Sequence, residues 1–133
     1  MAKGYARNQE RIQTLSSFGK DLTRRAKSKC ELCETSGVKL SIYEVPPVAD
    51  EPEFERCMLI CESCSSALDN IKKAPIAQMR FLENAIWSEV PAVKATAIYL
   101  LRVFADKTPW AREALDNVYI DPETEELLKN IEL

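Results

Sequence analysis

The sequence predicts an α+β protein with an N-terminal helix, a small β-hairpin enclosed by two cysteine pairs, and a C-terminal bundle of short helices. Apolar residues recur at helical spacing over residues 5–27, and an alternating, β-branched segment lies between the cysteine pairs. Helical patterns with proline-marked starts fill the chain from residue 75 onward. A chain of 133 residues suits one small domain with an extension, and we divide it into a module (1–72) and a helical extension (73–133).

The predicted first helix has an apolar side and a basic side. The apolar side is formed by Leu15, Phe18, Leu22 and Ala26. Residues 1–29 hold eight basic and two acidic residues, a surplus of six positive charges, whereas the whole chain carries −3, so the remainder carries −9. Either this is a solvated face on a core-packing helix, or it binds nucleic acid or another anion. The candidate nucleic-acid contacts are Arg7, Arg11, Lys20, Arg24, Arg25 and Lys27.

The segment between the cysteine pairs predicts a hairpin. "VKLSIYEV" alternates like a strand, "PPVADEPE" has the composition of a loop, and "FERCMLI" is the returning strand, which leads into "CESC". The following "SSALDNIKK" predicts a short helix, because Ser65 and Ser66 suit a helix start.

The two cysteine pairs predict a metal site. Their spacing is Cys-x2-Cys-x27-Cys-x2-Cys, and each pair brings two thiolates together in one turn. We therefore expect one structural Zn²⁺ per chain, bound by Cys30, Cys33, Cys61 and Cys64. A pair of redox dithiols is the alternative, and it would leave the small hairpin without a core to hold it. A four-cysteine site has no open coordination position, so it contributes folding energy rather than water activation.

The order of these features favours a treble clef over a zinc ribbon. In a treble clef the second cysteine pair opens a helix, whereas in a ribbon it lies in another hairpin turn. The helix predicted after Cys64 therefore favours the treble clef. The chain has no histidine, which excludes Ser-His and Cys-His nucleophiles and a His-ligated catalytic zinc.

Cys57 is the fifth cysteine and has no partner in the spacing pattern. Strand alternation places it with Leu59 and Cys61 on one side of the returning strand, opposite Met58 and Ile60. We interpret Cys57 as a small buried apolar residue. A reserve ligand or a redox-sensitive thiol are the alternatives.

Proline marks the starts of the C-terminal helices. Ser88 with Pro91, Thr108-Pro109 and Asp121-Pro122 each combine a capping residue with an early proline. A further helix is predicted to open near Pro75.

One C-terminal helix, residues 90–105, is nearly apolar all round. It is either the centre of the helical part or a subunit interface, so a homodimer is a possible assembly. Trp87 and Trp110 lie next to helix starts, and we expect them to pack in the core or between helices.

The sequence predicts a cytoplasmic protein. No apolar run reaches the roughly 20 residues of a membrane span, and "MAKGYARNQERI" lacks the apolar stretch of a secretory signal. Cysteine pairs at this spacing favour metal over disulfides in that compartment.

Several strings make the chain resemble the PhnA family, bacterial proteins named for a phosphonate-utilisation gene cluster. They are "GKDLTRRAKSKCELCETSGVKLSIYEVPPV", "CMLICESC", "WSEVPAV" and "WAREALDNVYIDPE", within about residues 8–125. The resemblance implies a zinc-binding N-terminal module with the same four cysteines as ligands. Members usually continue into a small C-terminal β-domain, so this sequence is either a short member or part of a longer chain. The family name does not establish phosphonate cleavage, and the residues present no catalytic constellation for it.

A more distant, fold-level resemblance is to HNH nucleases. "LSIYEVPPV" matches the frame around their general base, but Tyr43 and Glu44 stand where the histidine would be, and Ser65 follows the last cysteine. A nuclease needs a base for water and a ligand set for its metal. We therefore expect a non-catalytic zinc-binding module of the PhnA type that docks nucleic acid or protein. The alternatives are a degenerate nuclease centred on Glu44 and an interaction module that uses helix 90–105.

Overall fold

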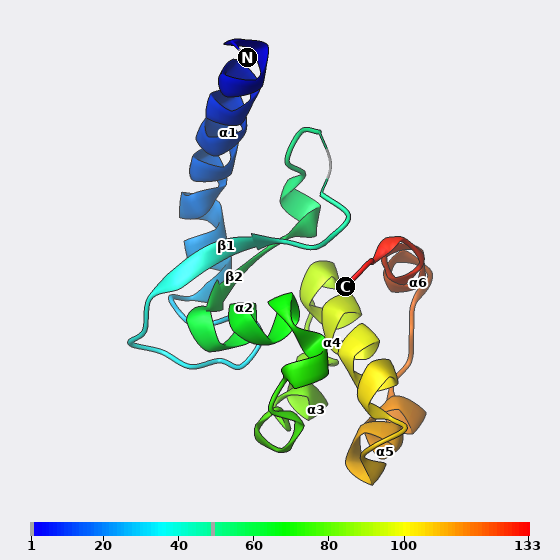
Figure 1. Ribbon diagram of the computed structural model, residues 1–133. Helices are drawn as coiled ribbons and strands as arrows, with labels where there is room; N and C mark the ends of the chain where they lie inside the picture. The colour runs from blue at the N-terminus through cyan, green and yellow to red at the C-terminus, as the bar shows by residue number, and fades with distance from the viewer. Residues whose placement is uncertain (1, 49) are drawn as a thin grey trace.

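The computed structural model describes residues 2–48 and 50–133, and their side chains from residue 9 onward. The elements in chain order, with η marking a 3-10 helix, are α1 (Ala2–Ala26), β1 (Leu40–Glu44), η1 (Phe54–Arg56), β2 (Cys57–Cys61), α2 (Glu62–Asp69), η2 (Ile71–Lys73), η3 (Ile76–Gln78), α3 (Leu82–Ala85), α4 (Pro91–Phe104), α5 (Pro109–Asn117) and α6 (Pro122–Asn130). The predicted α+β class and element order are confirmed (Figure 1).

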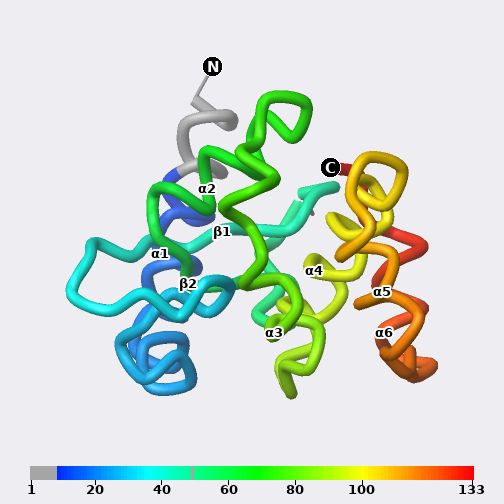
Figure 2. The backbone as a smooth tube through the Cα atoms, turned by 90° about the horizontal axis from the view of Figure 1, so that it is seen from below, coloured from blue at the N-terminus to red at the C-terminus, as the bar shows by residue number. Residues whose placement is uncertain are grey.

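The two strands form an antiparallel hairpin that lies between α1 and the C-terminal helices (Figure 2). Leu40 pairs with Cys61 and Glu44 with Cys57, so the register runs the full length of both strands. All five residues of β2 are buried. A strand can be buried throughout only when both of its faces are covered, so β2 is the middle layer of the molecule.

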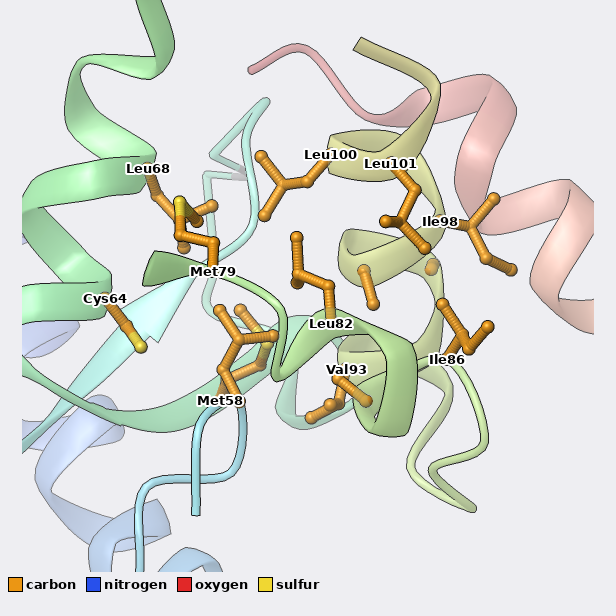
Figure 3. Packing of buried hydrophobic residues seen from close by; sticks show 14 of the residues in the cluster. Met58, Cys64, Leu68, Met79, Leu82, Ile86, Val93, Ile98, Leu100 and Leu101 are labelled. Carbon is orange, nitrogen blue, oxygen red and sulfur yellow. The ribbon is translucent and has the colours of Figure 1, made fainter. Parts of the chain in front are cut away.

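The two faces of β2 serve two cores. Cys57 and Leu59 pack with Leu22 of α1, whereas Met58 and Ile60 belong to the larger core shared with the C-terminal helices. The alternation predicted for these four residues is thus confirmed. Cys61, predicted on the side of Cys57 and Leu59, instead belongs to the larger core, because the chain turns there from β2 into α2. In Figure 3, Met58 and Cys64 from the hairpin side converge with residues of α3 and α4. The larger core spans the boundary at 72–73, so the module and the helical extension share one interior.

Helix α4 is the centre of the helical part. It contacts α3, α5, α6 and β2, and nine of its 14 residues are buried. Only Arg102 and Val103 are exposed. The apolar sides that made helix 90–105 a candidate subunit interface are therefore covered within the chain.

The proline-marked helix starts are confirmed at Pro91, Pro109 and Pro122. Asp121 caps α6, because its carboxylate accepts hydrogen bonds from the Thr124 amide (3.2 Å) and hydroxyl (2.7 Å). Its Oδ1 also lies 3.2 Å from Nζ of Lys94, which ties the start of α6 to α4.

Four further expectations about local structure differ from the structure. The N-cap of α4 is Val90 rather than Ser88, whose Oγ accepts a hydrogen bond from the Val90 amide at 3.1 Å. Helix α2 begins at Glu62 rather than at Ser65, because Cys61 ends the strand and becomes the N-cap. The helix predicted from Pro75 is broken into η3 and α3. Met79 follows the end of η3 and Leu82 begins α3, and both side chains are buried in the core. Trp87, expected to be packed, is 59% exposed.

No helix among the described residues has the length and apolar character needed to cross a bilayer.

Candidate metal centre

The four predicted ligands meet at one point. The Sγ atoms of Cys30, Cys33, Cys61 and Cys64 all lie within 4.8 Å of one another. The Cys30–Cys64 and Cys33–Cys61 pairs are each separated by 3.7 Å. Zinc–sulfur bonds of about 2.3 Å give a tetrahedron whose edges are about 3.8 Å, so these sulfurs are spaced as ligands of one ion. Among the described residues, no other group of three or more potential His, Cys, Asp or Glu ligands gathers in this way.

A tight turn positions the first pair. The Cys30 amide donates to the Thr35 carbonyl (3.0 Å), and the Glu34 amide donates to the Cys30 carbonyl (2.9 Å). Glu34 adopts a left-handed φ of 66°, which reverses the chain directly after Cys33. The Cys33 amide points at Sγ of Cys30 at 3.4 Å, so the turn also supplies a donor to a thiolate.

A strand-to-helix junction positions the second pair. Cys61 ends β2 and is the N-cap of α2, and Cys64 lies in the first turn of that helix. The positive end of a helix stabilises nearby thiolates. A cysteine turn, a hairpin, and a second cysteine pair that opens a helix make up the treble-clef arrangement, and this junction distinguishes it from a ribbon.

The sulfurs interact electrostatically. The hydrogen bond with Cys64 lowers the pKa of Cys30 to about 4 in spite of burial, and further backbone donors act in the same direction. The same hydrogen bond and burial raise the pKa of Cys64. Zinc binds thiolates, so binding of an ion must displace protons from this cluster.

A partly buried ion pair connects α1 to the metal centre. Glu31 lies between the cysteines of the first pair. Its carboxylate accepts hydrogen bonds from Nε (2.8 Å) and Nη2 (2.7 Å) of Arg25. Its Oε1 also accepts the Leu59 amide at 2.8 Å. Arg25 in turn donates to the Cys57 carbonyl (2.9 Å) and stacks over the Phe54 ring at 5.2 Å. Arg25 thus joins α1, the first cysteine turn and β2. The sequence carries no local signal for this pairing, because the three segments meet only in the folded chain.

Five of the six predicted nucleic-acid contacts have described side chains, and these divide into two groups. Lys20, Arg24 and Lys27 are exposed, whereas Arg25 is occupied by Glu31 and Arg11 by an ion pair with Glu44. Arg11 also donates to the Asp50 carbonyl at 2.9 Å. The Arg7 side chain lies outside the described residues. Lys29, which was not among the six candidates, is exposed beside the first cysteine turn.

The positions that match the nuclease frame have structural roles. The Glu44 carboxylate is paired with Arg11. Tyr43 packs against the larger core, and burial raises its pKa to about 12, so it stays protonated at neutral pH. Glu44 belongs to no group of potential metal ligands among the described residues.

Cys57 is fully buried next to Leu22 and Leu59 and does not belong to the four-sulfur cluster. Its Sγ donates to the Glu53 carbonyl at 3.3 Å. Burial, with the charge of Glu44, raises the pKa of the thiol to about 11. The predicted burial of Cys57 is confirmed, and this environment disfavours a reactive thiolate.

Comparisons of the chain with family models, with curated proteins and with solved structures return no match.

Proposed function

We propose that the chain is a non-catalytic zinc-binding module of the PhnA type, and that it docks nucleic acid through the exposed basic side of α1. Four thiolates at tetrahedral spacing suit Zn²⁺, which prefers soft ligands in a closed four-coordinate site. Such a site orders the fold and leaves recognition to the surface. The family assignment is supported by the residue strings given above.

The exposure of Lys20, Arg24 and Lys27 carries the nucleic-acid proposal. Phe18 and Leu22 face the hairpin, so packing of α1 on β2 leaves Lys20 and Arg24 in solvent, and Lys27 is exposed in the turn that directly follows the helix. Arg24 has an acidic neighbour, Asp21, only at 3.9 Å, with both side chains largely exposed. A pair of that kind is worth little and is available for exchange with a phosphate.

Binding of a duplex oligonucleotide, followed by fluorescence anisotropy at a series of salt concentrations, tests the proposal. If Lys20, Arg24, Lys27 and Lys29 each neutralise one phosphate, the logarithm of the affinity falls with the logarithm of salt with a slope of about −3 to −4. Alanine at the first three positions should then weaken binding at low salt and reduce the slope by about 3.

The matched control removes the same charge elsewhere. Lys72, Lys107 and Lys129 are exposed and lie outside α1, so their triple alanine variant has the same net charge as the first. Equal loss of affinity in both variants, or no binding at low salt, would contradict the proposal. Recovery of intact oligonucleotide after incubation with Mg²⁺ supports a non-catalytic role. Cleavage that is abolished by Glu44→Gln would instead favour the nuclease alternative.

A further inference from the structure

A small hollow with aromatic and acidic walls lies between α3 and α5. Its volume is about 210 Å³. One wall carries Glu83 and Trp87, the opposite wall carries Trp110 and Glu113, and the buried Ile86 lies beside them. Each wall therefore presents one indole ring and one carboxylate. These are the chain's two tryptophans, and neither belongs to the metal centre or to the basic side of α1.

Helical spacing creates both walls. Trp110, Glu113 and Asn117 fall three and four residues apart, so they share one face of α5. Glu83 and Trp87 are also four residues apart, at α3 and the turn that follows it. Trp87 is 59% exposed, so most of its large apolar surface is left uncovered by the described residues.

One cation of the chain already uses this combination of groups. The Arg80 guanidinium lies 5.6 Å from the centre of the Trp110 ring, and its Nε donates to Glu83 Oε1 at 2.6 Å. The hydrogen bond and charge of Glu83, followed by the charge of Glu113, raise the pKa of Arg80. The ion pair of Arg80 is with Glu83, so the carboxylate of Glu113 adds a second negative charge to the lining of the hollow. Among the described residues, neither Trp87 nor Glu113 has a cationic partner of its own.

We propose that this hollow binds a quaternary ammonium group, held between the Trp87 ring and the Glu113 carboxylate. Aromatic faces attract cations through their quadrupole, and indole does so most strongly. A quaternary ammonium has an apolar surface and no N–H, so it gains from the rings and the negative charge without needing hydrogen-bond acceptors. A primary ammonium is strongly hydrated and would lose that hydration on entry. The volume is below the range of about 300–1,000 Å³ typical of pockets for drug-sized ligands, so it suits a head group.

The indole N–H signals of the ¹⁵N-labelled full chain provide the test. There are only two such signals, and the spectrum of Trp87→Ala assigns both. We expect tetramethylammonium chloride to shift both signals saturably, with a Kd on the order of millimolar. The reference titration uses sodium chloride at the same ionic strength. The uncharged 3,3-dimethylbutanol, which has the shape of choline, should produce no saturable shift.

Variants locate the site. Trp87→Ala should weaken binding about tenfold or more, read from the remaining Trp110 signal, and Glu113→Gln should weaken it several-fold. Tyr119→Ala removes an aromatic ring that is 73% exposed and outside the hollow, and it should leave the affinity unchanged.

Two further ligands distinguish the sources of the group. Choline represents a free small cation, and a short peptide with trimethyllysine represents a modified side chain. Tighter binding of choline assigns the site to a small molecule, and tighter binding of the peptide assigns it to a protein side chain. Either result supports the proposal. Equal shifts with the neutral alcohol would overturn it, as would saturable binding seen only in Arg80→Ala, which would show that Arg80 itself fills the hollow. The absence of saturable binding to both the wild-type chain and Arg80→Ala would overturn it as well.

Discussion

On the α1 side of β2 the buried core consists of Leu22, Cys57 and Leu59, whereas on the α4 side it extends from Cys30 to Ile131. Among the described side chains, these three and half-buried neighbours such as Phe18 hold a helix of 25 residues against the hairpin. The smaller apolar core on the α1 side is supplemented by polar contacts, chiefly the ion pair of Arg25 with Glu31. It is also supplemented by the four-cysteine cluster, whose first pair flanks Glu31. The α4 side relies on apolar burial, worth about 25 cal/mol per Å² of area removed from water.

We therefore expect the two sides of β2 to respond differently when the four-cysteine cluster holds no ion. The site joins Cys30 and Cys33, which follow α1, to Cys61 and Cys64, which connect the hairpin to α2. Without an ion, the hairpin side loses its main cross-link. The helices around α4 keep their own apolar contacts, and both tryptophans report on that side alone.

The largest effect is expected from Cys61→Ser. The variant should lose the ion and several kcal/mol of metal-linked stability, because binding free energy is folding free energy at a structural zinc site. Native mass spectrometry should find one zinc per wild-type chain and none in the variant. Circular dichroism should show loss of the hairpin and of ordered α1. A variant that keeps one zinc and its fold would prove the ligand assignment wrong.

Cys57→Ala is the matched control, because Cys57 is a cysteine of the same strand that lies outside the four-sulfur cluster. It should keep its zinc and lose only about 1 kcal/mol, for the sulfur atom removed from the small core. A thiol count adds to the comparison. The Cys57 pKa of about 11 and its burial predict that no thiol of the zinc-loaded protein reacts quickly at neutral pH. Chelation should expose all five thiols.

The next effect tests the polar connection. Arg25→Ala leaves the Glu31 carboxylate, which is 4% exposed, with only the Leu59 amide as a partner. Removal of one member of a fully buried pair costs about 3 kcal/mol or more, and the 23% exposure of Arg25 reduces this, so we expect a loss of about 2 kcal/mol. Arg24→Ala, on the neighbouring residue, removes a side chain that is 73% exposed and should change stability by less than about 0.5 kcal/mol. Urea denaturation followed by circular dichroism measures both, and equal effects would contradict the proposed connection.

Sequence reasoning succeeded where the signal is local. The spacing of the cysteine pairs, the alternation from Cys57 to Ile60 and the prolines at helix starts each depend on residues close together in the chain. These patterns predicted the gathering of the four cysteines, the faces of β2 from Cys57 to Ile60 and the positions of α4, α5 and α6.

The features that escaped prediction depend on distant segments. Whether an arginine of α1 is solvated or paired depends on whether a carboxylate lies beside it in the folded chain. The sequence does not indicate that Glu31 pairs with Arg25 or Glu44 with Arg11. The exposure of Trp87 also depends on a distant segment, because α5 forms the other side of the hollow that Trp87 lines. A helical wheel separates apolar from basic sides, but it does not separate solvated cations from paired ones.

A smaller effect concerns acid stability on the α4 side. Hydrogen bonds from Thr124, with Lys94 nearby, lower the pKa of Asp121 to about 2 from its usual 3.8. Because the folded-state pKa is depressed, this contribution is present above about pH 4 and is lost as the pH falls toward 2. Asp121→Asn keeps a capping side chain but cannot ionise, so its stability should vary less over that interval. Tryptophan fluorescence during denaturation at each pH gives the comparison, and an unchanged pH profile would contradict this role for the carboxylate.

The smallest effect should be a gain. Thr96 of α4 is fully buried, and its hydroxyl oxygen has no hydrogen-bond partner. A buried hydroxyl without a partner keeps its desolvation penalty, so Thr96→Val should stabilise the protein by about 1 kcal/mol at nearly unchanged shape and helix propensity. Thr96→Ser keeps the hydroxyl and removes the methyl group, so it should destabilise the protein by about 1 kcal/mol. Urea denaturation read by tryptophan fluorescence measures both variants. If valine destabilised the α4 side as serine does, the hydroxyl would have a partner, and that core would not be as purely apolar as the contrast with the α1 side requires.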